Sequence, residues 1–245
     1  MSEIWLIDTD INAQQAALLM EFIDPEEIDR AARIPGGARR NRYLAAHAAA
    51  RRLTAAAAGA PPERIRWRRG PHGRPEPVGL AGELSVNLST SGPWALFAVQ
   101  HRAGGDGEIG VDLEPVPTDH AAARLARRYY PPSETGGGAA EFTSRWTRKE
   151  AYTKAYGGRL ADGLRTHVGP VGAPGGHGGS FRVDGPLGPC TVHDLPAPPG
   201  FRAAVARTGV RPLRPTLLTH PADWNDEFDA NRTSAICRPD RESRP

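Results

Sequence analysis

Hydrophobic and polar positions alternate over several short stretches of the chain, each bounded by turn-forming residues. The alternation predicts strands at 3–8, 64–69, 84–89, 94–100, 108–114, 180–184, 190–194 and 201–207. Helical spacing of apolar residues and alanine predicts helices at 12–33, 38–58, 118–130 and 139–157. The first of these breaks at Asp24-Pro25, because proline fits the first turn of a new helix. This mixture predicts an α+β fold.

Two of the predicted strands resemble each other, and both follow glycine or proline. They read WALFAVQ (94–100) and FRAAVAR (201–207). This similarity between the two segments predicts a pseudo-dimer of two similar α/β halves, 1–108 and 109–207, with a cleft between them. Residues 208–245 lack periodicity and are rich in arginine, proline and aspartate, so we expect a disordered tail there.

Composition narrows the class of protein. At 39% apolar and 24% charged residues, the chain has the make-up of a soluble globular protein. It has no run of 18 apolar residues, and its acidic N-terminus is not that of a signal peptide. Cys190 and Cys237 lie far apart without a metal-ligand spacing. We therefore expect a cytoplasmic protein without a membrane span or a zinc site.

Charge is distributed unevenly. Residues 1–29 hold eight acids and no base, whereas residues 30–74 hold twelve arginines and one acid, Glu63. Such a basic block suggests a polyanionic partner: nucleic acid, a phosphate-rich cofactor or an acidic protein. Only two of the 31 basic residues are lysines, Lys149 and Lys154. Lysine can give up its proton in a protein and arginine cannot, so 149–154 either needs lysine chemistry or holds two lysines by chance.

The strand at 109–114 (IGVDLE) carries two carboxylates on one face. Its period of two places Asp112 and Glu114 opposite the apolar residues, roughly 6–7 Å apart at Cα. Paired carboxylates of this kind suit Mg2+, which takes one or two of them together with water and substrate phosphates. The alternative is an acidic strand face exposed to solvent.

The helix at 139–157 carries a second candidate pair. Glu150 and Lys154 are four residues apart and share one face of this helix. They form either an ordinary intrahelical ion pair or part of an active site. The presence of a rare lysine after the acidic strand favours the second interpretation.

The order and separation of GVDLE (110–114) and WTRKEAYTK (146–154) resemble the paired signature of Sfp-type 4'-phosphopantetheinyl transferases. Weaker matches are RYLAAHAAARR (42–52), GRP (73–75), VNLSTSG (86–92) and FRAAVA (201–206). The resemblance implies a pseudo-dimer with its active site between the halves. It implies Mg2+-dependent transfer of 4'-phosphopantetheine from coenzyme A to a serine of an apo acyl or peptidyl carrier protein, releasing 3',5'-ADP.

The resemblance also implies roles for individual residues. Asp112, Glu114 and Glu150 match the magnesium carboxylates, with Asp112 and Glu150 also catalytic, and Lys154 matches the lysine that stabilises or protonates the leaving group. The expected coenzyme A contacts are Arg30, Arg42, Gly73, Arg74, Pro75, Ser89, Thr90 and Lys149. Thr90 departs from the family pattern, which usually has a histidine there that contacts a coenzyme A phosphate.

Two alternatives stay open at this stage. One is a nucleic-acid-binding module that uses the basic segment 30–74, although it leaves the acidic strand and the lysines unexplained. The other is a family member that binds coenzyme A but transfers weakly because of Thr90. On the transferase interpretation we expect a monomer that binds neither nucleic acid nor membrane and serves fatty acid, polyketide or nonribosomal peptide synthesis.

Overall fold

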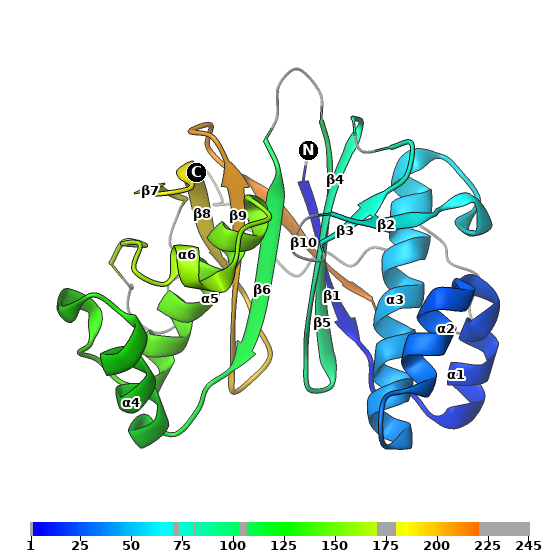
Figure 1. Cartoon of the computed structure of the whole chain (residues 1–245), viewed down its shortest axis with the longest axis horizontal. Helices are drawn as coiled ribbons and strands as arrows, with labels where there is room; N and C mark the ends of the chain where they lie inside the picture. Colours follow the sequence, from blue (N-terminus) through cyan, green and yellow to red (C-terminus); the bar gives the residue numbers. More distant parts are fainter. Residues whose placement is uncertain (1, 71–73, 81, 103–106, 171–179, 221–245) are drawn as a thin grey trace, which may run out of the picture.

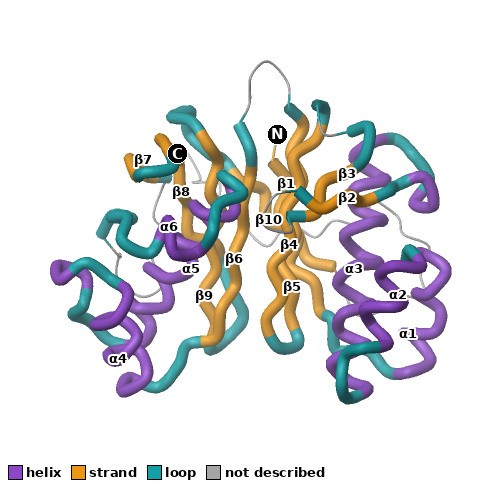
Figure 2. The backbone as a smooth tube through the Cα atoms, in the orientation of Figure 1, coloured by secondary structure: helices purple, strands orange, loops and turns teal. Residues whose placement is uncertain are grey.

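The computed structural model describes residues 2–70, 74–80, 82–102, 107–170 and 180–220. Two four-stranded sheets lie side by side in the middle of the molecule, and helices cover their outer sides (Figure 1). The tube view shows the same arrangement, with helices at both flanks and strands between them (Figure 2). The described part of the chain therefore forms four layers in the order helix, sheet, sheet, helix.

The first sheet has the strand order β10-β1-β5-β4. Its strands are β1 (Ser2–Asp8), β4 (Leu84–Ser91), β5 (Trp94–His101) and β10 (Pro215–His220). Strand β1 pairs in parallel with β10 and antiparallel with β5. Its helices are α1 (Ala13–Leu19), α2 (Pro25–Ala32) and α3 (Gly37–Ala58), with short 3-10 turns η1 (Met20–Phe22) and η2 (Pro62–Arg64). A small hairpin, β2 (Trp67–Arg69) and β3 (Pro75–Pro77), forms a two-stranded sheet of its own beside β4.

The second sheet has the strand order β6-β9-β8-β7 and is antiparallel throughout. Its strands are β6 (Ile109–Pro115), β7 (Phe181–Gly185), β8 (Gly188–Leu195) and β9 (Phe201–Thr208). The helices on its outer side are α4 (Asp119–Tyr129), α5 (Ala139–Ala155) and α6 (Leu160–Gly163), with the 3-10 turn η3 (Pro132–Glu134). Helix α5 packs against this sheet through Ala151, Tyr152 and Ala155.

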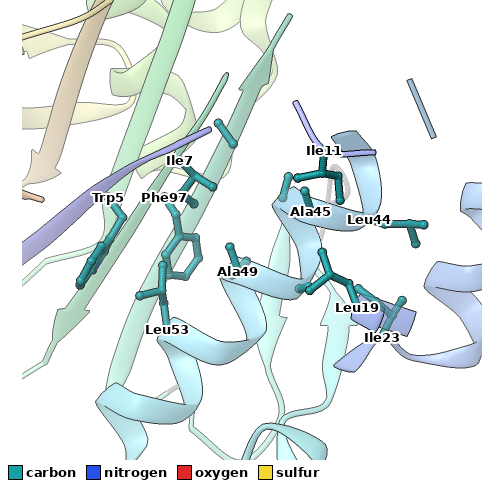
Figure 3. Packing of buried hydrophobic residues seen from close by; sticks show 14 of the residues in the cluster. Trp5, Ile7, Ile11, Leu19, Ile23, Leu44, Ala45, Ala49, Leu53 and Phe97 are labelled. Atoms are coloured by element: carbon teal, nitrogen blue, oxygen red, sulfur yellow. The ribbon is translucent and has the colours of Figure 1, made fainter. Parts of the chain in front are cut away.

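Separate apolar clusters hold the layers together. Between α3 and the first sheet, the helix contributes small residues at four-residue spacing, Ala45 and Ala49, followed by Leu53 (Figure 3). These face Phe97 and its neighbours on the sheet, so the alanine-rich helix lies close to the strands (Figure 3). A second cluster fills the space between the two sheets and includes residues from both: Ile4, Leu96, Ile109, Val111, Leu113 and Val205.

The mixed helix-and-strand fold expected from the sequence is confirmed, and so is the break at residue 24. Asp24 is the N-cap of α2, and Pro25 is its first residue. That the two halves are related as a pseudo-dimer stays a prediction. Within the described part of the chain, no helix is both long enough and apolar enough to span a membrane.

Two expectations need correction. The predicted strand at 64–69 is a strand only over 67–69, because residues 62–64 form a 3-10 turn. The expected disordered tail begins too early, because residues 215–220 form β10 at the edge of the first sheet. Leu218 of this strand is buried in the cluster under α3, and Leu217 packs against the cluster between the sheets. Residues 221–245 lie outside the described residues.

Candidate active site

Strand β6 uses its two faces differently. Its apolar residues are fully buried between the sheets: Ile109, Val111 and Leu113. The other face meets α5, and Gly110 allows this approach, because a Cβ there would lie 2.3 Å from the carbonyl oxygen of Ala151. The close contact between strand and helix brings Asp112 and Glu114 next to side chains of α5.

Three carboxylates meet at this contact. Ligand oxygens of Asp112, Glu114 and Glu150 all lie within 4.8 Å of one another. Asp112 is fully buried and the two glutamates are half-buried. Burial, followed by the charges of Asp112 and Glu150, raises the pKa of Glu114 to about 7. Burial, followed by the charge of Asp112, also raises the pKa of Glu150, so both glutamates hold a proton more tightly than exposed carboxyl groups do.

Lys154 supplies positive charge to the carboxylates. Its Nζ lies 2.5 Å from Oδ1 of Asp112 and 3.5 Å from Oε2 of Glu150. It also donates a hydrogen bond of 3.1 Å to Oγ of Ser89. Burial would lower the pKa of Lys154, but the carboxylates of Asp112 and Glu150 outweigh burial and raise it. The pair with Glu150 is therefore part of a larger constellation and not an isolated intrahelical ion pair.

The donor set fits a divalent cation. Oδ2 of Asp112 is buried and has no hydrogen-bond partner among the described residues. Carboxylate oxygens are the ligands that Mg2+ prefers, and three of them against one ammonium leave negative charge that such an ion would neutralise. A fully buried Asp112 also argues against a merely solvated acidic face.

Alternate residues of β4 hold β6 in place beside the cluster, and sequence reasoning gave a role to only one of them. Ser85 Oγ and Asn87 Oδ1 each accept a 2.9 Å hydrogen bond from a backbone N–H of β6. Ser89 donates to Oδ1 of Asp112 at 2.9 Å. Their period-two spacing in LSVNLS was the available signal, because such spacing places all three on one face.

Sequence reasoning also gave no role to Trp146. Its indole Nε1 donates a 2.8 Å hydrogen bond to Oε1 of Glu150, one helical turn away. The ring packs among Tyr129, Tyr130 and Phe142. Tyr130 itself is buried and donates to the carbonyl of Phe142, so core packing accounts for this tyrosine.

Lys149 does not join the site, which corrects its expected contact with coenzyme A. Its side chain is fully buried, and its Nζ lies 2.6 Å from Oε2 of Glu134. It also donates to the carbonyl of Thr166 and lies over the ring of Tyr130. The argument from rare lysines therefore holds for Lys154 alone.

A pocket of about 920 Å³ lies across the end of β4 from the carboxylates. Three of the expected coenzyme A contacts line this pocket: Arg30, Thr90 and Pro75 of the β2–β3 hairpin. Thr90 follows Ser89 in β4, so their side chains point to opposite faces of the strand. Ser89 faces the carboxylates, and Thr90 faces the pocket. Further cationic and aromatic side chains in the lining are His47, Arg66, Trp67, Arg68 and Arg69.

The acids of this pocket already have partners. Arg51 is almost fully buried and pairs with Asp24 and with Glu27, the second at 2.7 Å. Nδ1 of His47 lies 2.8 Å from the other oxygen of Glu27. Burial alone would raise the pKa of Glu27, but His47 and Arg51 outweigh it and lower the pKa to about 2. The lining arginines have partners as well, since Arg30 pairs with Glu26, Arg66 with Asp24 and Arg68 with Glu76. The side chains of Arg66 and Arg68 are mostly exposed, so an anion can still reach them.

The remaining expected contacts lie elsewhere. Arg42 pairs with Asp10 at 2.9 Å and does not line this pocket. Arg74 is largely enclosed by protein groups, with 13% of its side chain exposed. Gly73 lies outside the described residues. Because Arg40, Arg42 and Arg51 bind groups of the protein itself, the basic block is less available to nucleic acid than its charge suggests.

Comparison with known proteins places the chain in a family. Residues 108–185, which contain both β6 and α5, match the family model described as the 4'-phosphopantetheinyl transferase superfamily, and the chain belongs to this family. A protein of Synechocystis sp. with the name "Putative 4'-phosphopantetheinyl transferase slr0495" is 31% identical over 174 residues. The match covers 66% of this chain and 67% of that protein.

Proposed function

We propose that this protein transfers 4'-phosphopantetheine from coenzyme A to a serine of an apo carrier protein, with Mg2+ as its cofactor. The observation that carries the proposal is the meeting of Asp112, Glu114 and Glu150 with the ammonium of Lys154. Carboxylates for a cation, beside a lysine that can face a leaving phosphate, are the parts that phosphoryl transfer needs. The arginine-lined pocket across β4 supplies a place for the nucleotide phosphates.

The three carboxylates would hold Mg2+, which when bound supplies positive charge to the pyrophosphate. The carrier serine attacks the β-phosphorus of coenzyme A, and the bond to 3',5'-ADP breaks. Glu150, whose pKa burial raises, takes the proton of the serine. Lys154 stays protonated and stabilises the negative charge on the leaving phosphate. Trp146 donates to Oε1 of Glu150 and so orients the carboxylate, whose other oxygen, Oε2, faces Lys154.

The experiment incubates the protein with coenzyme A, Mg2+ and an apo carrier protein and then weighs the carrier. We expect the carrier to gain one phosphopantetheine group, and Asp112→Asn to abolish the gain. Asp184→Asn is the matched control, because Asp184 is exposed on β7 and pairs only with Arg182 among the described residues. A carrier that gains no mass with the wild-type protein, or gains it equally with Asp112→Asn, would contradict the proposal.

A further inference from the structure

Arg74 lies just before β3, and its guanidinium reaches three elements that carry the candidate active site. Its two terminal nitrogens contact β4, the start of β6 and the end of α5. Burial lowers the pKa of Arg74, whereas Glu108 beside it acts in the opposite direction. Arg74 also lines a pocket of about 730 Å³, but its two terminal nitrogens already have six acceptors in the protein, which leaves them little capacity for a ligand.

The contact with α5 is made at the last turn of the helix. Nη1 of Arg74 lies 3.2 Å from the carbonyl oxygens of both Lys154 and Ala155. The last carbonyls of a helix lack partners within the helix, and a cation beside them is favourable. Arg74 therefore fixes the turn from which the side chain of Lys154 projects.

The contact with the strands is made by the other nitrogen. Four acceptors lie 2.9–3.2 Å from Nη2: Ser85 Oγ, Val86 O, Glu108 Oε2 and Ile109 O. Because Nη2 has two hydrogens, these acceptors share them. Ser85 also accepts a hydrogen bond from the backbone of β6, so Arg74 reinforces the junction between the two sheets.

The same three elements present Ser89, Asp112 and Lys154 to one another. We propose that Arg74 is a positioning residue: it sets the place of the Lys154 ammonium relative to Asp112 and Ser89, and it does not read coenzyme A itself. Only the expected effect on turnover rests on the proposed function, whereas the position of Lys154 can be measured without it. The bidentate, planar guanidinium suits this task, because the point charge of a lysine cannot reach the helix end and the strand junction together.

The test compares Arg74→Lys and Arg74→Ala with wild type by three readouts: turnover under saturating coenzyme A, the dissociation constant of coenzyme A, and NMR of labelled lysines. The chain has only two lysines, so Lys154 reports on the site and the buried Lys149 serves as an internal control. Arg102→Ala is the matched variant, because Arg102 also pairs with Glu108 and, within the described part of the chain, its side chain makes no hydrogen bond to α5.

We expect both Arg74 variants to shift the Lys154 signals and leave those of Lys149 in place. Turnover should fall by roughly 100-fold, the usual loss for a displacement of about 1 Å at a reacting group. Coenzyme A affinity should stay within about twofold, because the lost interaction acts on the transition state. Arg102→Ala should leave the Lys154 signals unchanged.

Two results would overturn the inference. Unmoved Lys154 signals with much weaker coenzyme A binding would make Arg74 a ligand contact. Unmoved signals with a lower melting temperature and turnover within about threefold would make it a stabilising residue only, well short of a positioning effect. If the wild-type protein transfers no phosphopantetheine, the proposed function fails. The NMR comparison still shows whether Arg74 sets the position of Lys154. Arg74→Lys keeps a positive charge beside Glu108, so this variant alone carries the test if Arg74→Ala does not fold.

Discussion

The contact between β6 and α5 predicts a large effect from the smallest possible substitution, Gly110→Ala. A Cβ at residue 110 would lie 2.3 Å from the carbonyl oxygen of Ala151 and 2.4 Å from the backbone nitrogen of Ala155. Ordinary contact begins near 3.4 Å, so the first of these distances is about 1.1 Å too short. Both atoms are backbone, so no side-chain rotation relieves the overlap and α5 must move by about 1 Å.

That movement should affect stability and activity separately. Overpacking of this kind typically costs about 1–3 kcal/mol of unfolding free energy. Glu150 and Lys154 move with α5, and misplacing reacting groups by about 1 Å costs roughly 100-fold in rate. Urea unfolding would measure the first effect, and single-turnover transfer to an apo carrier protein would measure the second at a temperature where the variant is folded.

Gly37→Ala is the matched control. Residue 37 opens α3, and a Cβ there meets nothing within 4 Å, so alanine should be neutral or stabilise the helix by up to about 1 kcal/mol. A Gly110→Ala protein with wild-type unfolding free energy and a transfer rate within about threefold, far less than the predicted loss, would refute the packing argument.

Three further predictions concern the titratable groups. Lys154→Arg should lower single-turnover transfer by roughly 100-fold with little change in coenzyme A affinity, because the larger guanidinium group of arginine does not fit between Asp112 and Ser89. Near wild-type turnover would show that Lys154 forms only a simple ion pair. Lys149→Met should cost about 3 kcal/mol in urea unfolding, the low end for breaking a buried pair, because the buried Glu134 loses the ammonium at Oε2 and keeps only His167 beside Oε1 among the described residues. Lys149→Met combined with Glu134→Gln should recover part of this loss, whereas an unchanged stability would show that the buried pair contributes little. Because the pKa of Glu114 is about 7, protons compete with Mg2+ for this carboxylate below that pH. Calorimetry should therefore show Mg2+ affinity that falls by up to tenfold per pH unit on acidification and levels off above pH 7. A flat profile for wild type, matching that of Glu114→Gln, would contradict this assignment.

The sequence predicted the elements of the site better than their surroundings. Period two in β6 and the four-residue spacing of Glu150 and Lys154 follow from local geometry, so each pair could be placed on one face in advance. Only the family resemblance joined Glu150 to the two carboxylates of the strand. Whether Lys149 faces the site could not be foreseen, because its partner Glu134 comes from a separate turn. A long-range partner of this kind has no local pattern.

The fold shows the same limit. The long helix α3 and strands β4, β5 and β6 agree with the predicted segments, because each has a strong pattern of its own. Strand β10 was missed because six residues between arginine and proline carry little pattern, and its pairing partner β1 lies more than 200 residues earlier in the chain. Arg74 was expected at a ligand, and only the structure shows the backbone carbonyls that surround it.

Mg2+ binding by the carboxylate cluster tests the central claim most directly. Calorimetry with Mg2+ in the presence of coenzyme A should show one ion bound per chain, and Asp112→Asn should remove this binding while the protein keeps its melting behaviour and its secondary structure. The same titration on Asp184→Asn should match wild type, because that carboxylate lies outside the cluster. Unchanged Mg2+ binding by folded Asp112→Asn would contradict the assignment of Asp112, Glu114 and Glu150 as the metal centre.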